Sequence, residues 1–197
     1  QVIRGSKYTF GSDGVLLTSG MGIDVSHHQG NIDWTKAKTA ISFAIIRAGY
    51  RGSEGGLGVD RKYERNMKNA KANGVKVGIY FYSGATDAKT AYDEASFCIN
   101  LIKDYQITYP VAFDWELDGD YNSVTEACET FCNVIKSYGY QPMVYSNRNR
   151  WYNNFNGEKL SNKFKVWMAA YWSEYYYTST RWTYGDDLAS FKWHYDM

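Results

Sequence analysis

Two acids, Asp114 and Glu116, end the stretch YPVAFDWEL, whose first half has the apolar composition of a buried strand. Side chains two residues apart on a strand point to the same face, so both carboxylates would reach the same space, with Cβ atoms roughly 6–7 Å apart. Burying two carboxylates together costs free energy that a purely structural role rarely repays. The pair therefore predicts chemistry at the end of this strand.

Paired carboxylates are the catalytic residues of most glycoside hydrolases, and aromatic side chains beside them suit a sugar-binding cleft. One acid must stay protonated near neutral pH to donate to the leaving oxygen, and a neighbouring anion with partial burial raises a carboxyl pKa. We therefore expect Glu116 to be the general acid beside an ionised Asp114. Asp114 would serve as the partner carboxylate or would orient an acetamido group of the substrate as the nucleophile, and the residues leave both routes open.

The elements that must position these acids follow a repeating pattern from Gly22 onward. Six near-continuous apolar runs predict buried strands at residues 22–26, 43–50, 75–83, 109–117, 142–147 and 165–172. Helical patterns lie between them at 60–73, 87–105 and 123–138. This alternation predicts a parallel α/β sheet with right-handed crossovers, and six strands favour a barrel over an open sheet.

The helix boundaries have their own signals. A capping box from Ser123 to Glu126 would begin the last helix, and Gly74 and Gly139 would end two of the helices. Tyr92 falls on the apolar stripe of the helix at 87–105. We expect that tyrosine to be buried.

Reactive groups gather at the C-terminal strand ends of a β/α barrel. Asp24 ends the first strand and would join Asp114 and Glu116 there. The other predicted strand ends offer substrate-binding candidates: Arg47, Tyr80, Tyr82, Tyr145 and Tyr171. A lone aspartate at such a place is most often a cap, and a lone tyrosine more often packs than binds. The joint placement of three acids is what favours a catalytic cleft.

Composition excludes several other classes of function. The formal net charge is +1 with both signs interspersed, so no nucleic-acid partner is expected, and no apolar run approaches the roughly 18 residues of a membrane span. No fourth ligand completes a zinc site with the three cysteines. We interpret Cys98, Cys128 and Cys132 as buried thiols. The alternative is one disulfide that joins Cys98 to the helix that carries Cys128 and Cys132. Hydrolysis needs only water, so no metal or cofactor is implied.

Six motifs in this order, GIDVSHHQGNIDW, FAIIRAGY, GVKVGIYFYS, YPVAFDWE, QPMVYSN and VWMAAY, resemble glycoside hydrolase family 25, the muramidases of the Chalaropsis-lysozyme and phage-endolysin type. The resemblance implies an irregular TIM-like barrel of five β/α units and closing strands. It implies cleavage of the β-1,4 bond between N-acetylmuramic acid and N-acetylglucosamine, with retention. Glu116 would be the acid, Asp114 the residue stabilising the intermediate, and Asp24 a supporting carboxylate; the arginine and tyrosines above would line the subsites.

The sequence differs from the family pattern at both ends of the chain. Residues 1–20 carry a hairpin signal around Gly-Ser-Asp-Gly and resemble the end of a cell-wall-binding repeat, leaving 21–197 as the catalytic domain. The family pattern continues beyond WHYDM with a closing strand that bears another aspartate. We therefore expect the C-terminal closing strands to be missing, with Asp196 too early to replace that acid.

Two alternatives to a muramidase stay open: a chitinase-like hexosaminidase and a wall-binding fragment without catalysis. The expected partners are peptidoglycan glycan strands and, through upstream repeats, a cell-wall polymer. We expect a monomer that is secreted or associated with the cell wall. The biological role, whether remodelling of the cell's own wall, lysis of competitors or phage lysis, is left open.

Overall fold

The computed structural model describes residues 21–169, 192–194 and 196–197, together with four two-residue strands near the N-terminus. These strands are β1 (Val2–Ile3), β2 (Ser6–Lys7), β3 (Thr9–Phe10) and β4 (Leu16–Leu17). β1 pairs with β2 and β3 pairs with β4, each antiparallel. The division into a repeat-like segment at 1–20 and a catalytic domain at 21–197 stays a prediction.

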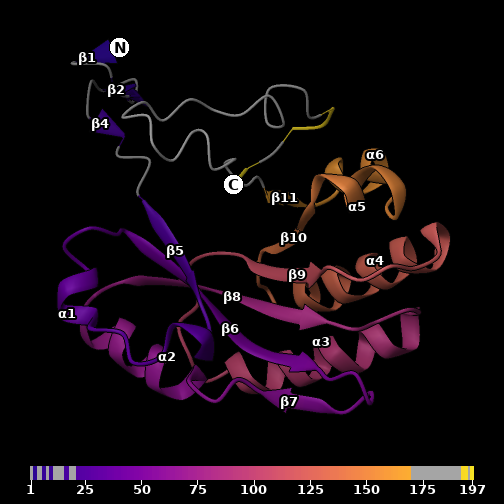
Figure 1. The fold of residues 1–197 in the computed structure, drawn as a ribbon, viewed down its shortest axis with the longest axis horizontal. Coiled ribbons are helices and arrows are strands. Elements are labelled where there is room, and N and C mark those ends of the chain that lie inside the picture. The colour runs from indigo at the N-terminus through magenta and orange to yellow at the C-terminus, as the bar shows by residue number, and fades with distance from the viewer. Residues whose placement is uncertain are drawn as a thin grey trace.

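A parallel sheet forms the centre of the described chain (Figure 1). Its strands run in the spatial order β5 (Gly22–Val25), β6 (Phe43–Arg51), β8 (Lys76–Ser83), β9 (Val111–Trp115), β10 (Pro142–Asn147) and β11 (Lys165–Ala169). All six predicted strands are present within a few residues of their predicted bounds. The short strand β7 (Leu57–Val59), which pairs antiparallel with the end of β6, was not predicted.

The sheet curls into a half-barrel within the described residues, so the predicted α/β class, with its closing strands missing, is confirmed. β5 lies at one edge. Beyond β11, the backbone N–H of Met197 donates to Val166 O at 3.1 Å, and the N–H of Met168 donates to Met197 O at 3.0 Å. The sixth strand was predicted to reach residue 172, and Tyr171 lies outside the described residues.

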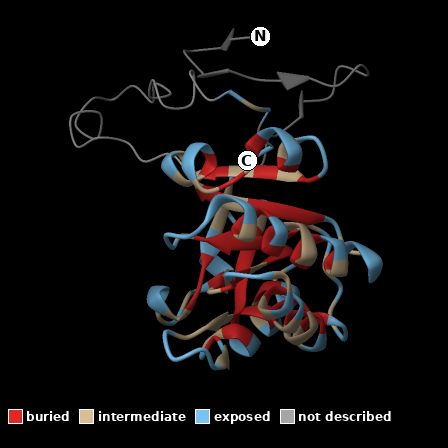
Figure 2. Ribbon diagram, turned by 90° about the vertical axis from the view of Figure 1, so that its right-hand side faces the viewer, coloured by how far each residue is buried: buried red, intermediate tan, exposed pale blue. Residues whose placement is uncertain are grey.

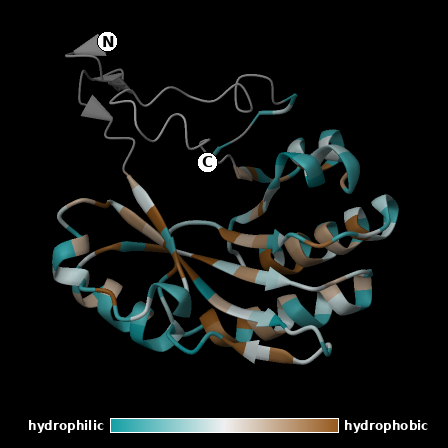
Figure 3. Cartoon of the chain, in the orientation of Figure 1, coloured by the Kyte–Doolittle hydropathy of each residue, from teal (hydrophilic) through white to brown (hydrophobic). Residues whose placement is uncertain are grey.

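The longer helices cover the outer face of the sheet. The described helices are η1 (His27–Gln29), α1 (Trp34–Ala37), α2 (Tyr63–Ala72), α3 (Ala88–Ile102), α4 (Tyr121–Ser137), α5 (Arg148–Asn153) and α6 (Gly157–Ser161). α2 and α3 pack on β6 and β8, whereas α4 packs on β9, β10 and α3. Figure 2 shows the buried strands between exposed helix surfaces, and Figure 3 shows the same division in hydropathy. No described helix has the length and apolarity needed to cross a membrane.

The helices confirm two predicted ends and correct one predicted start and one predicted buried residue. Gly74 and Gly139 adopt φ of 70° and 84° directly after α2 and α4, which is the left-handed conformation that ends a helix. The capping box was wrong: α4 begins earlier, because the carboxylate of Asp120 accepts from the N–H groups of residues 122 and 123. Tyr92 is 56% exposed, and Glu94 on the same helix is buried instead.

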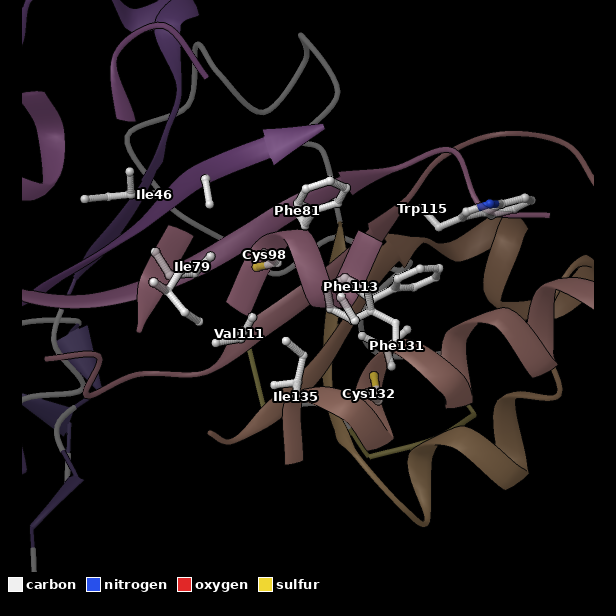
Figure 4. Packing of buried hydrophobic residues seen from close by; sticks show 14 of the residues in the cluster. Ile46, Ile79, Phe81, Cys98, Val111, Phe113, Trp115, Phe131, Cys132 and Ile135 are labelled. Carbon is white, nitrogen blue, oxygen red and sulfur yellow. The ribbon is translucent and has the colours of Figure 1, made fainter. Parts of the chain in front are cut away.

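The hydrophobic core lies between the sheet and the helices. Figure 4 shows Phe81 and Phe113 from neighbouring strands against Phe131 of α4; the Phe113 and Phe131 ring centroids are 5.2 Å apart. Cys98, Cys128 and Cys132 are buried there as free thiols, as the preferred interpretation predicted, and the alternative disulfide does not form.

Alternation along the strands determines which side chains point to the inner, concave face of the sheet. The core takes every second residue: Val77, Ile79 and Phe81 of β8, and Val111, Phe113 and Trp115 of β9. Because strand side chains alternate faces, the residues between them point the other way. On β8 and β9 these are polar near the C-terminal strand ends.

Candidate active site

A band of side chains crosses the concave face in register. Parallel pairing places Arg47 opposite Tyr80, and places Asp114 between Tyr82 and Tyr145. Tyr145 is in turn opposite Trp167 of β11. Neighbouring strands lie about 4.8 Å apart, so these residues form one continuous surface near the strand ends.

This band lines a cleft of about 460 Å³. Each described residue that the sequence predicted for catalysis or binding contributes to its wall: Asp24, Arg47, Tyr80, Tyr82, Asp114, Glu116 and Tyr145. Tyr171 lies outside the described residues and its predicted role stays a prediction. Ser26, His28, Gln29 and Trp167 also line the cleft.

Trp167 was missed by the sequence analysis, although a signal for it exists. The analysis selected residues at the predicted end of the sixth strand. Trp167 stands four positions before Tyr171, an even spacing that puts both on one face of a strand. Its ring centroid lies 4.6 Å from that of Tyr145 at 67°. Together these rings give the cleft an aromatic wall of the kind that packs on sugars.

Asp114 is the most buried acid of the cleft, with 4% of its surface exposed. Burial raises the pKa of its carboxyl well above the ordinary value, and the negative charge of Glu116 and a hydrogen bond with it raise it further. Arg47 opposes this shift. The raised pKa thus belongs to the deeper carboxyl, Asp114, which the sequence analysis expected to be ionised. The division of roles between the two acids stays a prediction.

Asp24 belongs to the same electrostatic cluster. It stands on β5 with its side chain accessible from the cleft. Partial burial by the cleft walls raises the pKa of Asp24, while its own backbone N–H opposes the rise. Its charge is among the causes that raise the pKa of Asp114. Asp24 and Glu116 therefore both act on Asp114 across a single space.

The guanidinium of Arg47 is held in place by the buried carboxylate of Asp60, a residue that the sequence analysis did not select. Asp60 Oδ2 accepts from Arg47 Nε at 2.8 Å, and it also contacts Nδ1 of His27 at 2.9 Å. Burial alone would raise the pKa of Asp60, but hydrogen bonds from His27, Lys62 and Arg47 outweigh it and lower that pKa. Asp60 is thus a buried anion that orients a cation of the cleft.

The two tyrosines of β8 stand between Arg47 and the acids. Burial raises the pKa of Tyr80, although Arg47 and a hydrogen bond with Ser26 oppose it. Burial and then the charge of Glu116 raise the pKa of Tyr82. Both phenols therefore stay neutral hydrogen-bonding groups. Among the described residues, no cluster of three or more histidines, cysteines or acids has a geometry that would hold a metal ion.

Comparison with known proteins identifies the family of the chain. The family model of glycosyl hydrolases family 25 matches residues 23–195. The chain belongs to glycosyl hydrolase family 25. The resemblance seen in its motifs is thereby confirmed, and the α/β half-barrel described above is the fold of a glycoside hydrolase family.

Curated relatives of this family 25 chain include proteins from two bacteria. The uncharacterized protein YegX of Escherichia coli K12 is 28% identical over 160 residues, covering 77% of this chain and 56% of that protein. The autolytic lysozyme of Clostridium acetobutylicum is 27% identical over 156 residues, covering 76% of this chain and 44% of that protein. The chain thus spans about half the length of the curated relatives it matches.

Solved structures share the fold. The modular autolysin LytC from Streptococcus pneumoniae, in complex with a synthetic peptidoglycan ligand, superposes with a TM-score of 0.69 at 25% identity, covering 90% of this chain and 45% of that one. The CTP1L endolysin gives a TM-score of 0.64 at 26% identity, covering 77% of this chain and 52% of that one. Both likenesses extend over most of this family 25 chain.

Proposed function

We propose that this chain is the catalytic part of a muramidase that cleaves the β-1,4 bond between N-acetylmuramic acid and N-acetylglucosamine in peptidoglycan. The observation that carries the proposal is the convergence of Asp24, Asp114 and Glu116 on one aromatic-lined cleft in a family 25 chain. Relatives named as an autolytic lysozyme and an autolysin with a peptidoglycan ligand support this substrate.

Glu116 is the proposed general acid. It follows the last residue of β9 and is only partly buried, whereas Asp114 lies deeper. It is therefore the carboxyl of the pair that faces substrate in the open part of the cleft. Its proton passes to the leaving glycosidic oxygen, and the same carboxylate then takes a proton from the attacking water.

Asp114 is proposed to orient the substrate. It lines the cleft and keeps 4% of its surface exposed. The exposed part of its carboxyl would accept from an acetamido N–H of the sugar and turn the acetamido oxygen toward the anomeric carbon. Attack of that oxygen breaks the glycosidic bond as Glu116 protonates the leaving group, and water then opens the resulting ring with net retention. Asp24 would stabilise the positive charge that develops.

The proposed setting follows from the substrate. A muramidase meets its polymer outside the cytoplasmic membrane, so we propose that the protein is secreted or associated with the wall. A wall polymer bound through repeats like residues 1–20 would hold it there, with the chain acting as a monomer.

Replacing Glu116 by Gln tests the function. We expect the unaltered chain to release reducing ends from purified cell walls and Glu116→Gln to lose at least about a hundredfold of that rate with an unchanged fold, since general acid catalysis contributes about that much or more. Glu126→Gln, an exposed position on α4, is the matched control. Full activity of Glu116→Gln would remove it as the acid. Activity on chitin oligomers alone would favour a hexosaminidase, and wall binding without hydrolysis would favour a binding module.

A further inference from the structure

A second pocket lies beside the cleft at the hairpin between β6 and β7. We call it the arginine pocket; Arg47, Arg51, Tyr50, Tyr82 and Ser53 contribute to its walls, and its volume is about 230 Å³. Arg47 and Tyr82 also line the cleft. The two cavities therefore share a wall, and a ligand that fills the cleft can place a side group in the arginine pocket.

The acids that pair with the two arginines lie behind them. Asp60 contacts Arg47, and Glu94 contacts Arg51, each at 2.7 Å. Both carboxylate side chains have 0% exposure, whereas the arginine side chains keep 10% and 13%. Among the described residues no acid lines the arginine pocket, while three acids line the cleft. The arginine pocket thus presents two guanidinium groups to a ligand, whereas the cleft beside it presents carboxyl groups.

The arginines retain donors for a ligand. A guanidinium carries five N–H groups. Arg51 uses three of them, on Glu94, on the carbonyl of Gly55 and on the carbonyl of Thr90. Arg47 directs Nε and Nη2 at Asp60, and its Nη1 has no partner among the described residues. These contacts fix both guanidinium planes, and a fixed planar fork suits a carboxylate.

We propose that the arginine pocket binds a carboxylate of the peptide stem of N-acetylmuramic acid while the glycan strand occupies the cleft. The inference rests on the proposed muramidase function and names a second part of the substrate. The stem is linked to the same sugar whose glycosidic bond is broken, so its carboxylates lie next to the cleft. A phosphodiester wall polymer would suit the same donors, so the test below uses substrates from which such polymers have been removed.

A charge placed at the mouth of the pocket tests the inference without disturbing the buried pairs. Ser53 is exposed in the β6–β7 turn. Ser53→Glu adds a competing carboxylate there, and Ser53→Gln has nearly the same shape without the charge. Asn133→Glu, on the exposed face of α4, controls for the change in net charge. The substrates are glycan strands with intact peptides and the same strands after their peptide carboxylates are converted to amides, both freed of phosphodiester polymers.

We expect kcat/KM of Ser53→Glu to fall about two- to fivefold below that of Ser53→Gln on peptide-bearing strands, the range of a partly exposed ion pair. The difference should shrink at high salt and be absent on strands whose peptide carboxylates are amides. An equal ratio on both substrates, no difference on either, or a difference seen only with phosphodiester-bearing walls would overturn the inference. If the unaltered protein cleaves neither substrate, the proposed function itself fails and the inference with it.

Discussion

The guanidinium of Arg47 is held by the carboxylate of Asp60, with Nε 2.8 Å and Nη2 2.7 Å from Oδ2. Asp60 is 2% exposed and receives further hydrogen bonds from His27 and from the backbone of Lys62. Arg47 in turn is the cation that opposes the raised pKa of Asp114. The buried anion thus acts on the cleft through the arginine that it positions.

Asp60→Asn should destabilise the fold by about 3 kcal/mol at pH 7, because it leaves a buried arginine without its counter-charge. The native pKa of Asp60 is lowered, so its stabilisation is present above the unfolded value of about 3.9 and is lost as pH falls through the native pKa. Urea unfolding at several pH values would measure this. The difference from the unaltered chain should be largest at neutral pH and shrink below about pH 4.

The control for this prediction is Asp118→Asn, which removes an acid that is 89% exposed and pairs with Arg150 at 3.2 Å. An exposed pair contributes less than about 1 kcal/mol. A loss of the same size in both variants, or one that does not vary with pH, would contradict the role given to Asp60.

Asp114→Asn should have the opposite effect on stability. Its native pKa is raised, so the folded state binds its proton more tightly than the unfolded chain does. This contribution to the free energy of unfolding is fully favourable below about pH 3.9 and is lost as pH rises through the native pKa. At neutral pH, burial of this carboxyl therefore destabilises the folded state. We expect the variant to gain about 1 kcal/mol at pH 7 while losing hydrolysis, a trade-off common at active sites.

Thermal unfolding at pH 7 and pH 3.5, with a reducing-end assay, checks this prediction. The gain should be present at the higher pH and vanish at the lower one. Lower stability of Asp114→Asn at pH 7 would show that the native carboxylate is well compensated, contrary to the pKa direction.

Strand periodicity was enough to predict the cleft. Asp24, Tyr80, Tyr82 and Asp114 stand at alternate positions of apolar runs, and alternation alone assigns them to the face that the helices do not cover. Parallel pairing then brings the strand ends together. Local pattern therefore predicted the sheet and the acids, arginine and tyrosines that line the described cleft, but not Trp167.

The residues that fix the site could not be predicted in this way. Asp60 is 13 residues from Arg47 and 33 from His27 along the chain, and Glu94 is 43 residues from Arg51. Such pairs depend on how the hairpin and helices pack, which no local period encodes. On α3 the apolar pattern included Tyr92, which is exposed, and passed over the charged Glu94, which is buried.

Glu94 should be far more important for stability than its neighbour Asp93. Glu94 accepts from Arg51 Nε at 2.7 Å and from Ser83 Oγ at 2.5 Å with its side chain fully buried, whereas Asp93 forms an exposed pair with Lys89. Removing one partner of a buried pair costs about 3–5 kcal/mol, so Glu94→Ala should lose that much and Asp93→Ala less than about 1 kcal/mol. Urea unfolding of both variants would decide, and similar losses would refute the buried network.

Gly78 on β8 permits close contact with the neighbouring strands beneath Tyr80. A Cβ added there would lie 2.7 Å from the carbonyl oxygen of Pro110 and 2.6 Å from Cδ1 of Ile45. The backbone oxygen cannot rotate away as a side chain can, so Gly78→Ala must shift β8 or β9.

Overpacking of this kind costs about 1–3 kcal/mol, and a shift of β8 would also move Tyr80 within the cleft. We therefore expect Gly78→Ala to lose stability in thermal unfolding and to bind a non-cleaved glycan more weakly. Gly56→Ala, in the β6–β7 turn, meets nothing within 4 Å. It should be neutral or slightly stabilising, since alanine reduces the conformational entropy of the unfolded chain. If the two substitutions had equal effects, close packing at Gly78 would not be what sets the position of β8.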